Sequence, residues 1–504
     1  MMKDLAGLTE KLKRGGEPKY HERLAELKKL FARKRIELLC DKDSFVEDGL
    51  FANCLDESLA ADGVVTGLGM VAGRRIALMA NDSTIKAGSW GARTVEKIIR
   101  IQETAGRLLL PLIYLVDSAG ARITDQVEMF PGRRGAGRIF YNEANLSGKI
   151  PQICALFGPS AAGGAYIPAF CDVVVMVEGN ASMYLGSPRM AEAVIGEKVS
   201  LEEMGGARMH CSQSGCGDFL VPNETAAIEI VKRYLSYMPQ RGGEPPVVTK
   251  TLPPEKGDLR AIVPDSPTRA YDMHQVIRQI VDAGSVMEIK ELYAKELITV
   301  LARIEGRVVG VIANQPLVKG GVIFSESANK AARFIQICNA YGLPILFVED
   351  VPGFMIGSQV ERNGIIRAGA KMIHAMSTVA VPKIALIVRK AFGAGLYAMS
   401  GPAFASDCVM ALPTASIAVM GPEPAVNAVY FNKMETMSPE EKKSFVADKV
   451  QEYEKDIDLK RMGSELIVDH LVDFPDVRKE IAIRMGYYCE GLSTRLAPSP
   501  ILPM

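Results

Sequence analysis

The sequence predicts an α/β protein built from two duplicated domains behind a helical N-terminal arm. Three observations predict it. Short apolar runs alternate with helix-like segments along the chain. A diverged repeat keeps a constant spacing, and each repeat contains a loop of small residues directly after a predicted strand. At 504 residues the chain is long enough for two large domains.

The repeat keeps strands and turns in register between the two halves. Gly73 and Gly306 each open a strand-like run and lie 233 residues apart. Asp117 and Asp350 each follow a second apolar run and have the same separation. A period of this length is far too long for a solenoid unit, so it indicates a duplicated domain.

Each half is predicted to hold the same strand–helix–strand unit, with further buried strands after it. Ile98, Ile99 and Ile101 mark the helix of the first half, and Ala331, Phe334 and Ile335 mark that of the second. The predicted strands are Ile76–Ala80, Leu112–Val116, Ile153–Phe157, Val173–Val177, Val308–Ala313, Ile345–Glu349, Lys383–Val388 and Val409–Leu412.

Composition also predicts the domain boundaries. Residues 1–45 are rich in Lys, Arg and Glu and are predicted to form the helical arm. Gly and Pro cluster at 242–246 and again at 253–254, which indicates a linker. The predicted domains are therefore 46–245 and 255–500.

The overall composition excludes several classes of protein. Apolar residues make up 48% and charged residues 23%, and Lys+Arg and Asp+Glu both number 59. Zero net charge disfavours binding to nucleic acid or to an anionic membrane. No apolar run approaches the roughly 20 residues of a membrane span, and the charged start of the chain does not resemble a signal peptide. We expect a cytoplasmic protein.

The cysteines do not indicate a metal site. There are nine, and none forms a CxxC pair. The tightest group is His210-Cys211 with Cys216, whose spacing is a poor zinc pattern. We expect thiols in a reducing compartment and no metal bound by this chain.

The two small-residue loops are the candidate chemistry. The first, at 158–166, contains Ala162, Gly163 and Gly164, and the second, at 389–397, contains Gly393, Ala394 and Gly395. Small residues let backbone amides approach a ligand closely, and converging amides suit an anion or a developing oxyanion. The alternative is that both loops are tight packing turns. Two loops at equivalent repeat positions favour the oxyanion function.

Other motifs are weaker. No P-loop is present, and the Gly158–Ala162 segment lacks the final glycine of GxSxG, so Ser160 is predicted to be a packing residue. The segment around Lys371 has Ala in place of the first Met of the biotin-attachment sequence AMKM, so we expect no biotin on this chain. Arg133, Arg134 and Arg138 could contact a phosphate or form a solvated face.

Several motifs together resemble the carboxyltransferase (β) subunits of biotin-dependent acyl-CoA carboxylases. The resemblance covers about residues 20–490 and includes the two small-residue loops. The segments 393–397 and 201–211 resemble the methylcrotonyl-CoA branch more than the propionyl-CoA branch, whereas 87–93 matches neither. The other matching segments are 116–122, 137–142, 348–354, 418–421 and 472–475.

The resemblance implies two crotonase-like domains with a ββα superhelix and a site that works by position and dipoles. Amides aligned at Ala162 and Gly163 would hold the thioester enolate of an acyl-CoA. Amides aligned at Ala394 and Gly395 would hold the ureido oxyanion of biotin after carboxybiotin releases CO2, and the biotin nitrogen would take the substrate proton. The implied catalytic loops also include Gly164 and Gly393. The implied biotin- and CoA-binding side chains are Tyr166, Tyr397, Phe354 and Arg138.

The resemblance also implies partners and an assembly. Carboxybiotin would be supplied by a separate biotin carboxyl carrier protein, which a biotin carboxylase subunit charges. A homohexamer is implied in which the first half of one subunit faces the second half of another.

The predicted function is carboxyl transfer from carboxybiotin to the α or vinylogous carbon of an acyl-CoA, with methylcrotonyl-CoA or propionyl-CoA as the expected substrate. Three alternatives stay open. One is a related decarboxylase acting on glutaconyl-CoA or methylmalonyl-CoA. Another is a crotonase-type hydratase or thioesterase, which would need a carboxylate as general acid/base. The last is a non-catalytic scaffold.

Overall fold

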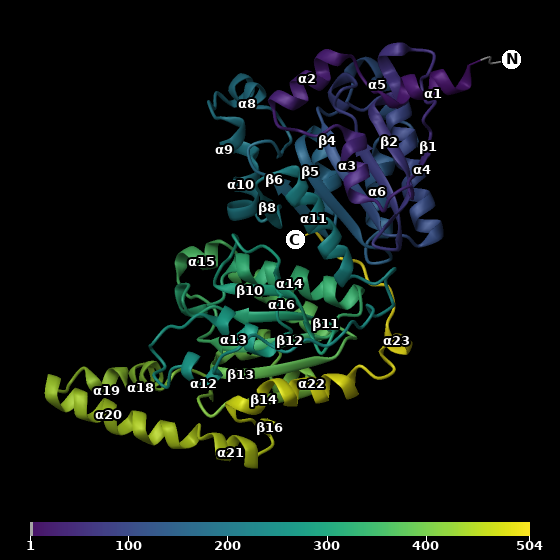
Figure 1. Cartoon of the computed structure of the whole chain (residues 1–504). Helices are drawn as coiled ribbons and strands as arrows, with labels where there is room; N and C mark the ends of the chain where they lie inside the picture. Colours follow the sequence, from purple (N-terminus) through teal and green to yellow (C-terminus); the bar gives the residue numbers. More distant parts are fainter. Residues whose placement is uncertain (1–3, 504) are drawn as a thin grey trace. The chain divides into compact units, whose positions relative to one another are not determined.

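A computed structural model describes residues 4–503 and divides the chain into two compact units, each with its own sheet (Figure 1). The first unit extends to Pro246 and also includes Ala497–Pro503, and the second spans Val247–Leu496. The sequence assigned residues up to 500 to the second domain. In the structure the Ile501 amide donates to Ser147 Oγ at 2.9 Å, which holds the end of the chain on the first unit.

The first unit contains an eight-stranded sheet in the order β1-β2-β3-β4-β5-β6-β8, with β7 paired to the end of β5. The strands from β3 onward pair in parallel, and β1 to β3 are antiparallel. Its strands are β1 (Val46–Asp48), β2 (Val64–Val71), β3 (Arg74–Asn81), β4 (Leu112–Ser118), β5 (Gln152–Ala161), β6 (Val173–Val177), β7 (Ser182–Tyr184) and β8 (Phe219–Val221).

The second unit repeats this topology strand for strand. Its eight-stranded sheet runs β16-β14-β13-β12-β11-β10-β9, with β15 paired to the end of β13. The predicted duplication and the α/β class are therefore confirmed. The strands are β9 (Met287–Glu288), β10 (Leu297–Ile304), β11 (Arg307–Asn314), β12 (Ile345–Val351), β13 (Lys383–Phe392), β14 (Cys408–Ala411), β15 (Ser416–Ala418) and β16 (His470–Leu471).

Helices connect the strands in both units. Those of the first unit are α1 (Leu5–Lys13), α2 (Pro18–Glu26), α3 (Ala32–Leu39), α4 (Ala92–Leu108), α5 (Gln126–Met129), α6 (Gly137–Leu146), α7 (Tyr166–Phe170), α8 (Pro188–Ile195), α9 (Leu201–Gly205), α10 (Ala207–Met209) and α11 (Glu224–Tyr237). The predicted arm thus consists of α1, α2 and α3. No helix within residues 4–503 combines the length and the apolar character needed to cross a membrane.

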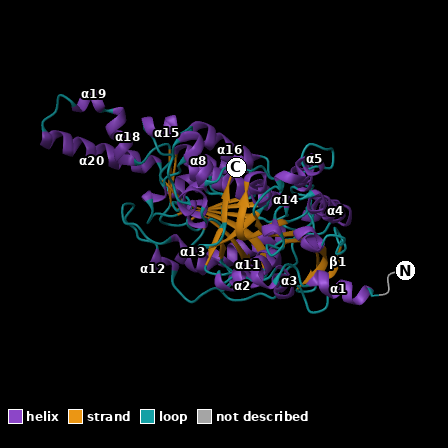
Figure 2. Ribbon diagram, turned by 90° about the horizontal axis from the view of Figure 1, so that it is seen from above, coloured by secondary structure: helices purple, strands orange, loops and turns teal. Residues whose placement is uncertain are grey.

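The helices of the second unit surround its sheet, except for α19 and α20, which extend away from it (Figure 1). They are α12 (Leu259–Ile262), α13 (Met273–Ile280), α14 (Ser325–Ala340), α15 (Ser358–Arg362), α16 (Ile365–Ser377), α17 (Gly393–Ala398), α18 (Pro422–Val429), α19 (Phe431–Met434), α20 (Pro439–Asp456), α21 (Leu459–Ser464), α22 (Val477–Tyr488) and α23 (Leu492–Arg495). Helix α20 packs on α18, has no buried residue and extends away from the sheet (Figures 1 and 2).

Buried lysines show how closely the two units correspond. Lys97 on α4 donates to the carbonyl oxygens of Ala61, at 2.9 Å, and Val64. Lys330 on α14, 233 residues later, donates to the carbonyl oxygen of Leu297 at 2.7 Å. Burial lowers the pKa of both amines to about 8. In each unit the lysine satisfies carbonyl groups at the entrance to the second strand of the sheet, as buried polar groups require.

The core explains why the central strands are almost entirely apolar. One face of the second sheet packs on α13 and α22 through residues such as Val348, Leu386 and Ile481. The opposite face is covered by α14 and α16 (Figure 1). Strands β12 and β13 are thus buried on both faces, which is the usual reason for continuous apolar runs in parallel sheets. The carboxyl ends of β5 and β13, each paired with the short strand β7 or β15, lead directly into the small-residue loops.

Candidate functional site

The first small-residue loop follows directly from the end of β5. Ala162–Ala165 form a short 3-10 turn that leads into α7. Ala162 has φ +52°, a left-handed conformation that costs a non-glycine residue roughly 1 kcal/mol. Ser160 is buried, and its Oγ donates to the Gly164 carbonyl at 2.9 Å. The buried Ser160 side chain therefore stabilises the backbone of the loop, in agreement with its predicted packing role.

The second loop follows β13 in the same way. Gly393 has φ +55° and opens α17. Ala394 is exposed, whereas Gly395 is buried against the end of β12. A Cβ added at Gly395 would lie 2.7 Å from Val351 Cγ2 and 3.0 Å from Gly353 Cα, so only glycine fits there.

The two loops correspond at an offset of 231 residues. Ala162 corresponds to Gly393, and both have positive φ. Gly163 then corresponds to Ala394, and both are exposed. The amides predicted to act in each half, Ala162 with Gly163 and Ala394 with Gly395, are therefore offset by one residue from strict equivalence. The first N–H groups of a helical turn have no carbonyl partner within it, so the amides of Gly163 and Ala394 are free to donate.

The helices that follow the two loops are short. Helix α7 has 5 residues and α17 has 6. Because each helix is so short, its dipole contributes little to the binding of an anion at its N-terminus. The convergence of amides in the loop itself has to provide the hydrogen bonds.

A β-bulge precedes each loop. Val116 of β4 pairs with Leu156 of β5 and Ser118 pairs with Ser160, so residues 157–159 lie opposite the single residue Asp117. In the second unit Glu349 pairs with Ile387 and Val351 pairs with Ala391, so 388–390 lie opposite Asp350. Bulges of this kind re-aim the end of a strand and are common beside active sites.

Aromatic side chains surround the first loop. A Cβ at Gly163 would meet only the ring of Phe140, at 3.9 Å. The Phe140 ring is 5.7 Å from that of Tyr166, one of the predicted binding residues, and 6.5 Å from that of Trp90. Trp90 is 3% exposed, and its ring would contact a Cβ at Gly164 at 3.8 Å. The exposed amide of Gly163 thus lies beside an apolar wall.

The second loop has a different set of neighbours. Phe354 is half-buried after the Gly353 turn, and its ring packs on Gly369 of α16. Tyr397 is 48% exposed, and its ring centroid is 5.5 Å from that of Phe404. A hollow of about 910 Å³ reaches Phe392, the last residue of β13. The predicted binding residues Phe354 and Tyr397 both flank the second loop.

The basic group on the first unit is partly neutralised. Arg134 pairs with Glu96 at 2.9 Å and with Glu103 at 3.1 Å. Arg138, at the start of α6, lies over the ring of Tyr141 at 4.4 Å. Arg138 and the exposed Arg133 are consequently the cations of this group that are available to a phosphate.

Two buried carboxyl groups cannot serve an exposed substrate as acid or base. Glu143 and Glu349 are both 0% exposed. Burial raises the pKa of each carboxyl well above its usual range, and neither side chain is accessible to a ligand at the surface. Within residues 4–503, no group of three or more His, Cys, Asp or Glu is arranged to hold a metal ion.

Sequence reasoning missed the charged residues beneath the loops. Lys29 and Arg35 on the N-terminal arm pair with Asp117, and Arg389 and Lys390 pair with Asp350. The repeated aspartates at the 233-residue spacing were a usable signal, as were two cations at the end of an otherwise buried strand.

Comparison with known proteins agrees with this architecture. The family described as "Carboxyl transferase domain" matches residues 26–498. A Bacillus subtilis (strain 168) protein named "Uncharacterized carboxylase YngE" is 59% identical over 499 residues, which cover 98% of each chain. The "Methylcrotonoyl-CoA carboxylase beta chain, mitochondrial" of Dictyostelium discoideum is 39% identical over 96% of this chain and 84% of its own length.

A solved structure shares the fold over nearly the whole chain. The transcarboxylase 12S crystal structure, described as a hexamer assembly with methylmalonyl-coenzyme A and methylmalonic acid bound, matches with a TM-score of 0.91. It is 35% identical, and the match covers 99% of this chain and 96% of that one. With two duplicated α/β units, equivalent amide loops and a family match over almost its full length, the chain belongs to the carboxyl transferase domain family.

Proposed function

We propose that this chain is the carboxyltransferase subunit of a biotin-dependent acyl-CoA carboxylase. It would move a carboxyl group between biotin on a separate carrier protein and the α or vinylogous carbon of an acyl-CoA, with methylcrotonyl-CoA or propionyl-CoA as substrate. The observation that carries the proposal is the pair of equivalent loops, each presenting an exposed amide after a bulged central strand. Two such loops suit a reaction in which charge develops on two separate oxygens.

The second loop fits a biotin ring. Gly393 turns the chain sharply, Ala394 is exposed, and the half-buried Phe354 and exposed Tyr397 provide apolar surface near the loop. In this proposal the Ala394 amide donates to the ureido oxygen of biotin. Bound biotin supplies the nitrogen to which the carboxyl group is attached. In this proposal the loop keeps the ring in one orientation.

The first loop fits an acyl thioester. The Gly163 amide would donate to the thioester oxygen, where negative charge develops when the neighbouring carbon loses a proton or a carboxyl group. Trp90 and Phe140 would pack on the acyl chain, and Tyr166 would cover its outer edge. Arg138 would contact a phosphate of CoA. A crotonase-type hydratase would need an accessible carboxylate, and Glu349, which is 0% exposed, cannot fill that role.

The full-length chain alone tests the proposal. We would supply 3-methylglutaconyl-CoA or methylmalonyl-CoA as carboxyl donor and free biotin as acceptor, and detect the decarboxylated acyl-CoA. A C–C bond breaks, an N–C bond forms on biotin, and the proton from that nitrogen goes to the α or vinylogous carbon that lost the carboxyl group. We expect biotin-dependent turnover without ATP. Biotin-independent hydration of the acyl-CoA or release of free CoA would favour the hydratase or thioesterase alternative, and no decarboxylated product with either donor would contradict the proposal.

The single tryptophan provides a direct test of where the acyl-CoA binds. Trp90 is buried beside the first loop, and the chain contains no other tryptophan. We expect methylcrotonyl-CoA to change the Trp90 fluorescence saturably, because the acyl chain would pack on that aromatic wall. Free biotin should leave the fluorescence unchanged. A change caused by biotin alone would place the ligands in the opposite loops.

Partners and assembly form the remainder of the proposal. Since the chain lacks AMKM and a P-loop, biotin and its ATP-dependent charging would come from a biotin carboxyl carrier protein and a biotin carboxylase subunit. We propose a cytoplasmic homohexamer, supported by the similarity to the transcarboxylase 12S structure described as a hexamer.

A further inference from the structure

Each loop is built on a buried aspartate at the bulge that precedes it. Asp117 at the end of β4 is 2% exposed, and Asp350 at the end of β12 is 0% exposed. Each aspartate lies opposite three residues of the neighbouring strand. Two further residues separate these three from Ala162 in the first unit and from Gly393 in the second. A buried carboxylate is costly unless it is paired and hydrogen-bonded, so its partners decide whether the bulge is stable.

In the second unit the partners come from the bulged strand itself. Arg389 contacts Asp350 Oδ2 at 2.9 Å, and Lys390 contacts Oδ1 at 3.6 Å. The backbone amide of Lys390 also donates to Asp350 Oδ1, at 3.2 Å. Residues 388–390 are therefore tied to the aspartate by both side-chain charge and backbone.

In the first unit the bulged strand cannot do this. The residues that correspond to Arg389 and Lys390 are Gly158 and Pro159, which carry no charge, and proline has no N–H to donate. The Asp117 carboxylate instead packs directly on Gly158, where an added Cβ would lie only 1.9 Å from Oδ1.

The N-terminal arm supplies the missing cations. Lys29, in the connection between α2 and α3, places its Nζ 2.7 Å from Asp117 Oδ1. Arg35 on α3 contacts Asp117 Oδ2 at 3.1 Å and Glu224 at 2.7 Å, and its guanidinium lies 4.5 Å from the ring centre of Phe157 in the bulge. Burial alone would raise the pKa of Asp117, but the two cations hold it below its usual range.

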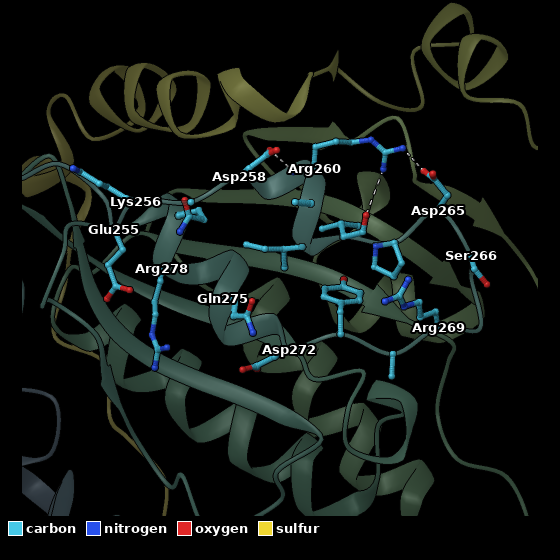
Figure 3. Close-up of a pocket in the computed structure, with 18 residues that line it drawn as sticks. Glu255, Lys256, Asp258, Arg260, Asp265, Ser266, Arg269, Asp272, Gln275 and Arg278 are labelled. Carbon is cyan, nitrogen blue, oxygen red and sulfur yellow. Dashed lines mark hydrogen bonds and ion pairs between the residues drawn. The ribbon is translucent and has the colours of Figure 1, made fainter.

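The corresponding stretch of the second unit has the reverse chemistry. Residues 264–272 precede α13, just as the connection that contains Lys29 precedes α3. Their backbone carbonyl groups accept hydrogen bonds from the cation, whereas Lys29 is itself the cation. The carbonyl oxygens of Ser266 and Arg269 each accept from Arg389 Nη1 at 2.7 Å. Both residues line one side of a hollow of about 950 Å³ formed by residues 255–279 (Figure 3). In both units the segment before this helix is thus linked to the aspartate at the bulge. In the first unit the cations come from the N-terminal arm, and in the second they come from the bulged strand β13.

We propose that Lys29 and Arg35 are positioning residues for the first amide loop, and that they replace within the N-terminal arm what Arg389 and Lys390 do within β13. The arm is then part of the acyl-CoA half of the site, whereas the second loop is held by its own strand. This assignment of each loop to a substrate rests on the proposed function. The structural coupling itself does not.

Matched variants test the inference in the full-length chain. Lys29→Met and Lys390→Met each remove one cation, and each leaves the aspartate its arginine partner. We expect Lys29→Met to raise the KM for 3-methylglutaconyl-CoA about tenfold and leave the KM for free biotin within about twofold. Lys390→Met should raise the KM for free biotin about tenfold and leave the KM for 3-methylglutaconyl-CoA within about twofold. Lys29→Arg keeps the charge and should restore the KM for the acyl-CoA.

Hydrogen exchange provides a readout that does not depend on activity. Lys29→Met should accelerate amide exchange in 157–166 and leave 388–397 unchanged, and Lys390→Met should do the reverse. A uniform acceleration in both segments, or none in either, would overturn the inference. If neither variant changes the KM of one substrate more than that of the other, the assignment of substrates to loops is wrong. Absence of turnover in the unmodified chain would contradict the proposed function, while the exchange pattern would still decide whether the arm holds the loop.

Discussion

Replacing Gly163 with proline is expected to lower kcat by about 10²–10³, which corresponds to roughly 2.7–4 kcal/mol. Proline removes the N–H that we propose donates to the thioester oxygen. The position is exposed and lies in the first turn after β5, where that N–H has no carbonyl partner within the turn. Proline also disfavours the left-handed conformation of Ala162 before it, so the fold of the variant has to be measured. Carboxyl transfer from 3-methylglutaconyl-CoA to free biotin measures the effect, and thermal unfolding shows whether the variant is folded.

Gly163→Ala is the matched control. The added Cβ would meet only the Phe140 ring at 3.9 Å, an ordinary contact, and the N–H remains. We expect turnover within a few-fold of the unmodified chain. If the alanine and proline variants lose activity equally, the crowding of the loop rather than its amide is responsible, and the role in charge stabilisation is wrong.

Mixing two inactive variants is expected to restore activity if sites form between subunits. Gly163→Pro removes the first amide and Ala394→Pro removes its equivalent in the second unit. When the two are refolded together in equal amounts and assemble at random, about a quarter of the sites receive two intact loops. Specific activity should therefore return to about a quarter of that of the unmodified protein, from a background that is at least a hundredfold lower.

The control is a chain that carries both substitutions. It should stay inactive when refolded with either single variant, because every site then lacks one of the two amides. If the two single variants also stay inactive together, while size-exclusion chromatography shows that they have assembled, the two loops of one site belong to the same chain.

The sequence alone was sufficient to predict the α/β class, the duplication and the two loops. Burial on both faces makes the central strands apolar without interruption, and a duplicated sheet repeats that pattern at a constant spacing. Runs such as Leu112–Val116 and Lys383–Val388 therefore located strands β4 and β13 from composition alone. The small residues at 162–164 and 393–395 located both loops, since a close backbone approach excludes larger side chains.

Tertiary structure alone decided what holds those loops in place. Strands β4, β5, β12 and β13 are longer than predicted because each continues through a bulge, and a bulge depends on pairing with a neighbouring strand rather than on local sequence. Lys29 and Asp117 are 88 residues apart in the chain, and no periodic pattern relates them. A buried charge requires a partner of opposite sign, but the fold determines which one it meets: a strand neighbour for Asp350 and the N-terminal arm for Asp117.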